Sequence, residues 1–292
     1  MKTIGYLGLG VMGYGMTSNL IDKSGTTIYG YDPVPALRER FAQRGGKALE
    51  TGQELYETCD IIFMCLPTNA IVKATITEIL ETAKPGTTLV DMGSTSPYVI
   101  QELHAAALKK GFQLLDSPVS GGEIGANGGT LVIMCGGEKE VFDEVKPYLE
   151  MMGKTVTYMG PSGCGSTAKV ANNMMVGIHL LAMGEAFAFA TKAGLDPHTL
   201  FDAIKGGFAQ SAVMDVKVPK LLSRDFSASA RIAVHLKDIN NAMDVASHLG
   251  VELPMTEIVK EQIDWMDQHG MIDEDQCALA KYYEDAMGVE IN

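Results

Sequence analysis

The strongest constraint on this chain is one glycine-rich segment, Gly8-Leu9-Gly10-Val11-Met12-Gly13. It lies between a strand-like run at residues 3–7 and a helix-like run at residues 12–22. In such a segment the first glycine permits a tight turn, the second lets a phosphate approach the backbone, and the third lets the helix pack on the strand. Val11 and Met12 stand at the helix start, where backbone N–H groups and the helix dipole favour anions. The segment therefore predicts a dinucleotide-binding turn.

An acidic residue, Asp32, follows the next strand-like run at residues 26–31. An acid about 20 residues beyond the glycine turn can accept hydrogen bonds from the adenosine ribose of NAD, whereas it would repel the 2′-phosphate of NADP. Pro33 and Val34 come next, and the nearest arginine is Arg38. We therefore expect NAD as cofactor, with NADP disfavoured. The alternative, an ordinary turn beside a solvated acid, does not explain why strand, turn, helix and acid coincide.

The first half of the chain alternates strand-like and helix-like runs. This alternation predicts an α/β Rossmann domain with a doubly wound, mostly parallel sheet. The expected strands are residues 3–7, 26–31, 61–66, 88–91, 112–115, 130–135 and 154–158. The expected helices are residues 12–22, 34–44, 53–58, 70–82, 97–110 and 139–151.

The second half predicts an all-α domain that begins with one long helix at residues 166–193. We place the NAD-binding domain at residues 1–162 and the helical substrate and oligomerisation domain at 163–292. The long helix is apolar nearly all round, so most of its sides must be covered, and a second subunit is an expected part of that cover. The further expected helices are residues 197–205, 210–222, 234–249, 255–268 and 275–286.

Composition limits the partners and the location. The formal net charge is −13, which argues against a nucleic-acid partner. We expect no stretch long enough to span a bilayer, because Asn172, Asn173 and His179 interrupt the long helix. The strand-like run at residues 3–7 leaves no room for a signal peptide. The five cysteines are scattered without zinc spacing, so we expect a cytoplasmic protein with reduced thiols and no metal site.

A second glycine-rich loop, Ser120-Gly121-Gly122, follows the fifth expected strand. Successive backbone N–H groups there could hold a carboxylate, and a plain surface turn fits the composition equally well. Lys169 begins the long helix, and Asn173 shares its face at the i+4 position. Desolvation at the start of a buried helix would suit Lys169 to proton transfer, although most such lysines are simply solvated.

A basic group precedes the fourth helix of the second half. It consists of Arg231, His235 and Lys237. One interpretation is a solvated charged stretch, and the other is a positive contribution from Arg231 to a site for an anionic substrate.

Together these motifs resemble the β-hydroxyacid dehydrogenase family. The resemblance runs through essentially the whole chain, and it is carried in order by Gly8-Leu9-Gly10-Val11-Met12-Gly13, Leu66-Pro67, Asp116-Ser117-Pro118-Val119-Ser120-Gly121-Gly122, Lys169-Val170-Ala171-Asn172-Asn173 and Lys237-Asp238. It implies an NAD(P)-dependent oxidoreductase that interconverts a small 3-hydroxy acid and its semialdehyde. A homo-oligomer, either a dimer or a tetramer, is a separate expectation that rests on the apolar helix at residues 166–193.

The resemblance implies roles for matching residues near the substrate. Lys169 is similar to the family's catalytic lysine. The loop Ser120-Gly121-Gly122 is similar to the loop that holds the substrate carboxylate. Asn173 is similar to the amide that orients the substrate beside the lysine.

Other matching residues imply contacts with the cofactor. Leu66 and Pro67 stand at the end of the expected strand 61–66, and Ser94 stands where the family usually has threonine near the nicotinamide. Gly93 replaces a common serine, which removes one hydrogen bond to the cofactor. Lys237 is similar to the family lysine that closes over cofactor and substrate.

Within the family, the likeness is greatest to enzymes that interconvert tartronate semialdehyde and glycerate. It is carried by residues 206–211, 231–232 and 278–284, while Gln210 and the segment 225–230 depart from that subgroup. Alternative substrates are 3-hydroxyisobutyrate, 4-hydroxybutyrate and 2-(hydroxymethyl)glutarate. A more distant alternative is a non-catalytic dinucleotide-binding protein. Oxidative decarboxylation, as in the longer 6-phosphogluconate dehydrogenases, is disfavoured by the short helical half.

Overall fold

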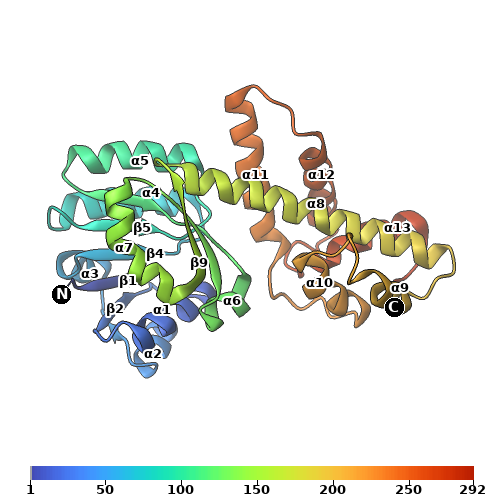
Figure 1. Cartoon of the computed structure of the whole chain (residues 1–292), viewed down its shortest axis with the longest axis horizontal. Helices are drawn as coiled ribbons and strands as arrows, with labels where there is room; N and C mark the ends of the chain where they lie inside the picture. Colours follow the sequence, from blue (N-terminus) through green and yellow to red (C-terminus); the bar gives the residue numbers. More distant parts are fainter. Residues whose placement is uncertain (1) are drawn as a thin grey trace. The chain divides into compact units, whose positions relative to one another are not determined.

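The computed structural model describes residues 2–292, which form two compact units (Figure 1). The first unit extends to Lys169, and the second comprises Val170–Asn292. The long helix α8 (Cys164–Lys192) begins in the first unit and continues in the second. The first unit is α/β and the second is helical, as the sequence predicts.

The first unit is built on one sheet, whose order in the described chain is β3-β2-β1-β4-β5-β6-β8-β7, with β9 paired to β8. The strands up to β6 are parallel, and the register aligns Tyr31, Leu7, Met64, Asp91 and Asp116 across five neighbouring strands. The strands are β1 (Ile4–Leu7), β2 (Ile28–Tyr31), β3 (Lys47–Ala48), β4 (Ile61–Met64), β5 (Thr88–Asp91), β6 (Gln113–Asp116), β7 (Val119–Ser120), β8 (Leu131–Gly136) and β9 (Gly153–Gly160).

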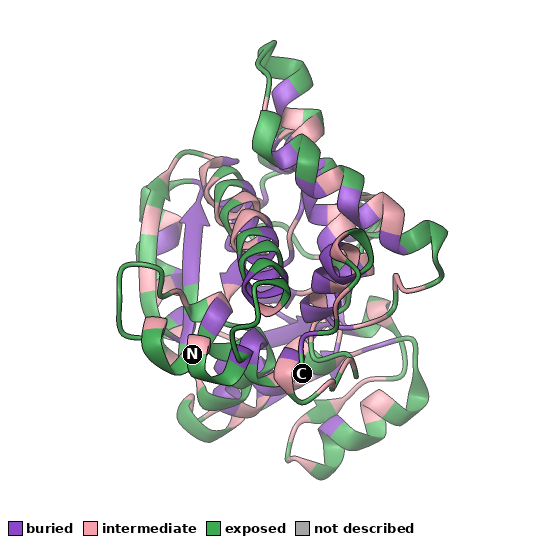
Figure 2. Ribbon diagram, turned by 90° about the vertical axis from the view of Figure 1, so that its right-hand side faces the viewer, coloured by how far each residue is buried: buried purple, intermediate pink, exposed green. Residues whose placement is uncertain are grey.

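Helices cover both faces of this sheet, and each face has its own core (Figures 1 and 2). Alternate residues of β4 point to opposite cores: Ile61 and Phe63 join the core beneath α1 and α7, while Ile62 and Met64 join the core beneath α3, α4 and α5. Burial on both faces explains why this strand is apolar at every position. The helices are α1 (Val11–Lys23), α2 (Pro35–Gln43), α3 (Gly52–Thr58), α4 (Asn69–Thr82), α5 (Pro97–Lys109), α6 (Gly122–Gly128) and α7 (Lys139–Met152).

The far edge of the sheet differs from a simple parallel continuation. β8 pairs antiparallel with β6 and β7, and β9 pairs parallel with β8. β3, β7 and α6 were not among the expected elements, because β3 and β7 have two residues each and α6 is a glycine-rich helix of seven. Elements this short carry too few positions for a periodic pattern.

The second unit packs helices around a separate core. Its buried members include Phe187, Val218 and Ile263. Ser211 begins α10 by accepting the N–H of Met214, and Asp196 begins α9 by accepting that of His198. The elements after α8 are α9 (Pro197–Ile204), α10 (Ala212–Leu222), α11 (Ile232–Leu249), α12 (Pro254–Gln268), the 3₁₀ turn η1 (Gln276–Leu279) and α13 (Ala280–Met287).

Helix α8 corrects two expectations. It begins at Cys164 rather than at residue 166, so Lys169 lies in its second turn and not at its start. With 29 residues it is also long and apolar enough, by length and composition alone, to cross a membrane. Of its most apolar 18-residue stretch, 44% is buried inside the protein. The expectation that no such stretch exists was therefore wrong, because three scattered polar residues do not offset the apolar ones.

Candidate active site

The glycine turn between β1 and α1 leaves open space only where a phosphate would approach. A Cβ on Gly8 would lie 2.5 Å from the Cys65 carbonyl oxygen, and one on Gly13 would lie 1.8 Å from the Gly8 carbonyl oxygen. Gly8 also has a φ of +86°, which disfavours any other residue. A Cβ on Gly10, in contrast, would meet no atom within 4 Å. The first and third glycines therefore serve packing, and the second leaves room for a ligand.

The start of α1 fits an anionic group. Gly10 is its N-cap residue and supplies no side-chain hydrogen bond. Val11, the first helical residue, is 56% exposed, and Met12 is half-buried. Backbone N–H groups and the positive end of the helix dipole therefore face the open side of the turn, where they would bind a pyrophosphate.

Asp32 is 7% exposed and is fixed by the backbone. Its Oδ2 accepts the N–H of Leu9 at 2.9 Å, and its Oδ1 accepts the N–H of Val34 at 2.9 Å. Each oxygen has a further lone pair for a ribose hydroxyl. Arg38 donates to the Asp32 main-chain carbonyl at 2.9 Å and pairs with Glu50 at 3.3 Å. The acid is thus tied directly to the glycine turn, as a cofactor-binding role requires.

The register of the parallel strands brings the remaining cofactor residues to the same edge. Leu7, Met64 and Asp91 lie side by side, so the segments that follow them are neighbours. Leu66 is half-buried, Pro67 is exposed, and Ser94 is half-buried. Gly93 donates its N–H to the Asp91 carboxylate at 3.1 Å.

The segment that joins β7 to α6 presents two glycines with positive φ, +130° at Gly121 and +59° at Gly122. Both are exposed, and Ser120 beside them is half-buried at the end of β7. Asp116 precedes this loop on the same edge and is fully buried. Its carboxylate accepts the N–H groups of Gly163 at 2.9 Å and Ser166 at 2.7 Å.

Lys169 lies one helical turn beyond Ser166 and is half-buried. Asp116 therefore holds the start of the helix that carries this lysine, and the N–H bonds that it accepts explain why α8 begins earlier than its sequence predicts. The first unit thus contains the phosphate turn, the ribose acid, the glycine loop and the lysine.

In the second unit, two predicted site residues share one partner, Asp238. Asn173, 5% exposed, donates its amide N–H to Asp238 Oδ2 at 2.6 Å and accepts a hydrogen bond from Asn172. The Lys237 ammonium lies 3.4 Å from the Asp238 Oδ1 atom. A single buried carboxylate therefore orients both the amide and the lysine.

Comparison with known proteins gives a consistent result over the whole chain. The NAD-binding domain of 6-phosphogluconate dehydrogenase matches residues 3–160, and the NAD-binding region of NADP-dependent 3-hydroxyisobutyrate dehydrogenase matches residues 163–283. The chain is 34% identical to 2-(hydroxymethyl)glutarate dehydrogenase of Eubacterium barkeri over 99% of its length and 97% of that protein's. It belongs to the β-hydroxyacid dehydrogenase family.

Two further relatives support this membership. The chain is 36% identical to 2-hydroxy-3-oxopropionate reductase of Escherichia coli (strain K12), over 96% of this chain and 97% of that one. A solved structure of 3-hydroxyisobutyrate dehydrogenase of Mycobacterium tuberculosis with L-serine has a TM-score of 0.88 and 32% identity, and covers 97% and 99% of the two chains. The protein is therefore a nicotinamide-dependent oxidoreductase of this family that acts on a CH–OH group.

The basic group predicted in the helical unit does not stay together as a single surface. Arg231, the residue before α11, is exposed and pairs with Asp273 at 3.4 Å. His235 is 2% exposed, so it is a core residue rather than a surface cation. Within residues 2–292, no group of three or more His, Cys, Asp or Glu side chains is placed to hold a metal ion.

Two buried acids, Asp116 and Asp238, were assigned no role from the sequence, although both stand inside motifs that carry the family resemblance. Asp116 ends a strand, and Asp238 follows Lys237 directly. Their place next to these motifs was the sequence signal for them. Their partners are far along the chain: those of Asp116 lie 47 and 50 residues away, and Asn173 lies 65 residues from Asp238.

Proposed function

We propose that this protein is an NAD(H)-dependent reductase of tartronate semialdehyde, forming glycerate, with NAD preferred over NADP. The observation that carries the reaction type is the combination, within one unit, of an open phosphate turn, a glycine loop suited to a carboxylate, and a lysine on a firmly anchored helix. The likeness to 2-hydroxy-3-oxopropionate reductase, at 36% identity over 284 residues, favours this substrate.

Asp32 and Arg38 support the cofactor preference. The buried carboxylate would repel a 2′-phosphate, and the nearest arginine is already paired with Glu50 and with the Asp32 carbonyl. The first unit therefore suits the two hydroxyls of an unphosphorylated ribose. Gly10, Val11 and Met12 would hold the pyrophosphate, and Leu66, Pro67, Ser94 and Lys237 would contact the remainder of the cofactor.

The bound cofactor supplies or accepts the hydride. Ser120, Gly121 and Gly122 hold the substrate carboxylate through backbone N–H groups and the serine hydroxyl. Lys169 donates a proton to the oxygen of the reduced aldehyde and removes it in the reverse direction, a role that contributes about 10²–10⁴-fold. Asn173 orients the reacting oxygen, and Arg231 adds positive charge for the anionic substrate.

A second candidate substrate is 2-(hydroxymethyl)glutarate, favoured by the full-length similarity to the Eubacterium barkeri enzyme. 3-Hydroxyisobutyrate and 4-hydroxybutyrate are further alternatives. These acids differ in length and in the number of carboxylates, so pocket size and charge would separate them.

The test is NADH oxidation by purified protein with a panel of aldehyde acids, led by tartronate semialdehyde and methylmalonate semialdehyde. A kcat/KM above about 10⁴ M⁻¹s⁻¹ identifies a true substrate. The proposal expects tartronate semialdehyde to reach this value and NADPH to be a poorer donor than NADH. A slow reaction with tartronate semialdehyde and a fast one with another member would overturn the substrate assignment alone.

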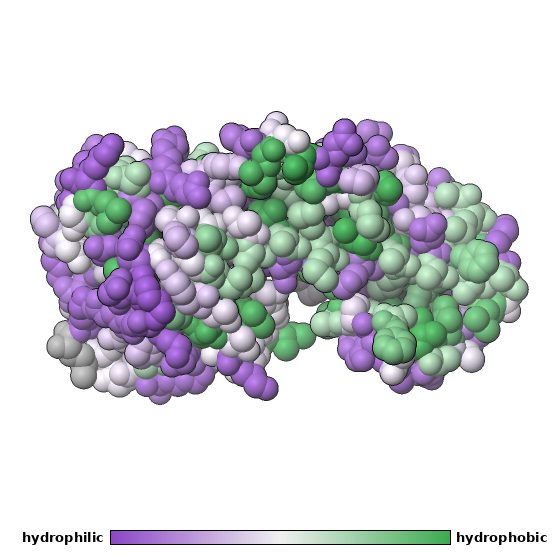
Figure 3. All heavy atoms as spheres, turned by 45° about the horizontal axis from the view of Figure 1, so that its top comes forward, coloured by the Kyte–Doolittle hydropathy of each residue, from purple (hydrophilic) through white to green (hydrophobic). Residues whose placement is uncertain are grey.

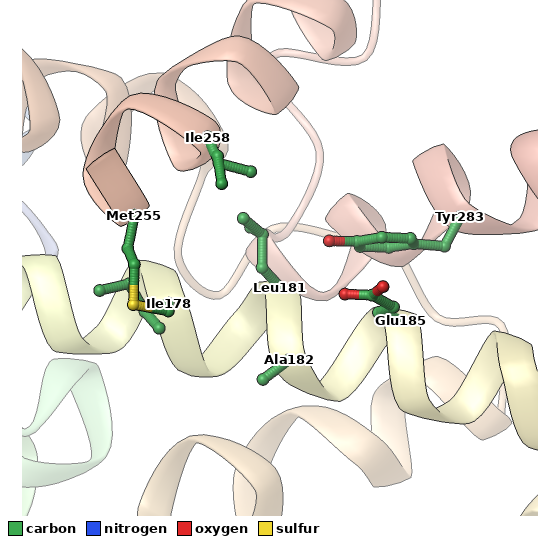
Figure 4. Close-up of a pocket in the computed structure, with 7 residues that line it drawn as sticks. All are labelled: Ile178, Leu181, Ala182, Glu185, Met255, Ile258 and Tyr283. Atoms are coloured by element: carbon green, nitrogen blue, oxygen red, sulfur yellow. The ribbon is translucent and has the colours of Figure 1, made fainter.

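We also propose that the protein is a homo-oligomer, a dimer or tetramer, formed through its helical unit. Hydrophobic side chains gather on the surface of that unit (Figure 3). Met175 and Phe189 of α8 are 59% and 67% exposed. An apolar cavity of about 140 Å³ lies between α8, α12 and α13 (Figure 4). Its lining residues are Ile178, Leu181, Ala182, Glu185, Met255, Ile258 and Tyr283. Sedimentation velocity tests this, and a monomer at micromolar concentration would contradict it.

We further propose a cytoplasmic location without nucleic-acid or membrane partners. The five cysteines are free thiols, which persist in a reducing compartment, and the net charge is −13. In this proposal the apolar helix α8 serves the protein core and a subunit contact rather than a membrane. Cell fractionation tests the location, and recovery of the protein with membranes would count against it.

A further inference from the structure

Asp116 is a fully buried acid whose carboxylate accepts two backbone N–H groups. It is 0% exposed, and it accepts hydrogen bonds from Gly163 and Ser166 at the start of α8. A carboxylate at a helix N-terminus satisfies backbone donors that would otherwise lack a partner, and its charge suits the helix dipole. An asparagine would offer one acceptor in place of two, and its NH₂ group would face a donor.

The backbone around this acid is in close contact, which leaves α8 little freedom. A Cβ on Gly165 would lie 2.4 Å from the Met134 carbonyl oxygen and 2.5 Å from that of Asp116. A Cβ on Gly136 would lie 2.6 Å from Asp116 Oδ1. The first turn of α8 therefore rests directly on β6 and β8, with no side chain between them.

The same acid begins the segment that leads to Ser120. The N–H of the next residue, Ser117, donates to the Asp91 carbonyl at 2.6 Å, and its hydroxyl lies 2.9 Å from the sulfur of Cys135. Met134 donates its N–H to the Pro118 carbonyl at 3.1 Å. The backbone that follows Asp116 thus leads into the Ser120–Gly122 loop, while the Asp116 carboxylate holds the helix that carries Lys169.

We propose that Asp116 is a positioning residue for proton transfer: it fixes the first turn of α8 against the sheet and thereby sets the position of Lys169 relative to the Ser120–Gly122 loop. This inference rests on the proposed role of Lys169. Misplacement of a catalytic group by about 1 Å costs on the order of 10²-fold in rate. A small displacement confined to the first two turns of α8 would move Lys169 without altering the glycine turn at β1, so the cofactor contacts of that turn would be spared.

The test compares Asp116→Asn, Lys169→Ala and the double variant. We expect Asp116→Asn to lower kcat about 10- to 100-fold, within the range expected for lost positioning, with the Kd of NADH changed less than about twofold. In the Lys169→Ala background, Asp116→Asn should have no further effect on kcat, because it acts through the lysine. Multiplicative effects in the double variant, or full activity of Asp116→Asn, would overturn the inference.

A matched control is Asp60→Asn. Asp60 also accepts a backbone N–H, from Thr3 at 2.7 Å; it pairs with Lys84 and lies just before β4, away from the carboxyl edge of the sheet. It should lower stability and leave kcat unchanged. If Asp116→Asn fails to fold, Asp116→Ser keeps one side-chain oxygen as acceptor for the two N–H groups without an NH₂ group that faces a donor; it should lower kcat in the same way, and unchanged kcat would sink the inference.

The outcomes separate this inference from the proposed function. Full activity of Lys169→Ala would refute the role of the lysine itself. A large loss in Lys169→Ala together with normal kcat in Asp116→Asn would refute only the positioning role.

Discussion

A carboxylate that is completely buried occurs in each unit of this protein, Asp116 in the α/β unit and Asp275 in the helical unit, but the two are stabilised differently. Burial raises the pKa of Asp116, and the N–H groups of Gly163 and Ser166 only partly offset this. Burial acts in the same direction at Asp275, but hydrogen bonds from Lys217 and Ser229 outweigh it and hold its pKa well below the ordinary value.

The Asp116 charge therefore lowers the stability of the folded protein, whereas the Asp275 charge raises it. The Asp275 carboxylate lies 2.8 Å from the Lys217 ammonium and also accepts N–H groups from Ser229, Ala230 and Cys277. These bonds tie the segment before α11 to η1. The Asp116 carboxylate is held instead by the backbone N–H groups of Gly163 and Ser166, so its charge lowers stability while it holds the helix of Lys169. We infer that Asp116 lowers the stability of the α/β unit while it fixes the position of Lys169.

The largest expected effect is on activity in the α/β unit. Lys169→Ala should lower kcat about 10²–10⁴-fold, because it removes the acid–base group, while the Kd of NADH stays nearly constant. Steady-state kinetics and fluorescence titration measure the two quantities. Lys192→Ala, an exposed residue in the last turn of the same helix, is the control and should have normal kcat. A loss below about tenfold in Lys169→Ala would remove the lysine from the mechanism.

The largest effect on stability should lie in the helical unit. Asp275→Asn leaves the Lys217 ammonium buried without its counter-charge, so the free energy of unfolding should fall by about 3–5 kcal/mol. Urea unfolding followed by circular dichroism measures it. Asp202→Asn, which breaks an exposed pair with Lys205, should cost no more than about 1 kcal/mol. Equal costs for the two variants would break the comparison.

A smaller effect is expected at the cofactor acid. Asp32→Asn removes a charged acceptor worth about 1.5–3 kcal/mol, so NADH binding should weaken about tenfold or more, while NADPH should lose less or gain. Titration of both cofactors measures this ratio. Glu50→Gln, which changes only the exposed partner of Arg38, serves as the control. An unchanged NADH to NADPH ratio in Asp32→Asn would argue against its contact with the ribose.

The smallest expected effect is in the pH dependence of stability. Asp275 has a lowered folded pKa, so its stabilisation is complete above the unfolded value of about 3.9 and is lost as the pH falls toward the folded value. Asp116 has a raised pKa in the folded state, so the destabilisation caused by its buried charge disappears as the pH falls through that pKa and the carboxylate is protonated. Asp275→Asn should therefore flatten the acid loss of stability, and Asp116→Asn should steepen it. Urea unfolding between about pH 3.5 and 7 tests both, and slopes that change in the same direction would contradict the comparison.

The sequence by itself determined the elements whose causes are local. The turn at Gly8, Gly10 and Gly13 needs only the steric freedom of glycine between a strand and a helix, and the structure has Gly8 and Gly10 between β1 and α1 and Gly13 in the first turn of α1. The apolar run of β4 predicts a strand covered on both faces, because its alternate side chains enter two cores. The order of the motifs along the chain likewise indicated the family.

Only the tertiary structure decided how distant residues act on one another. The bond between Asp116 and Ser166 spans 50 residues, and that between Asn173 and Asp238 spans 65. Local periodicity carries no record of such pairs, because each depends on where packing brings two separate elements. The early start of α8, the antiparallel β8 and the burial of His235 have the same origin: hydrogen bonding and burial between distant segments override what each segment would favour alone.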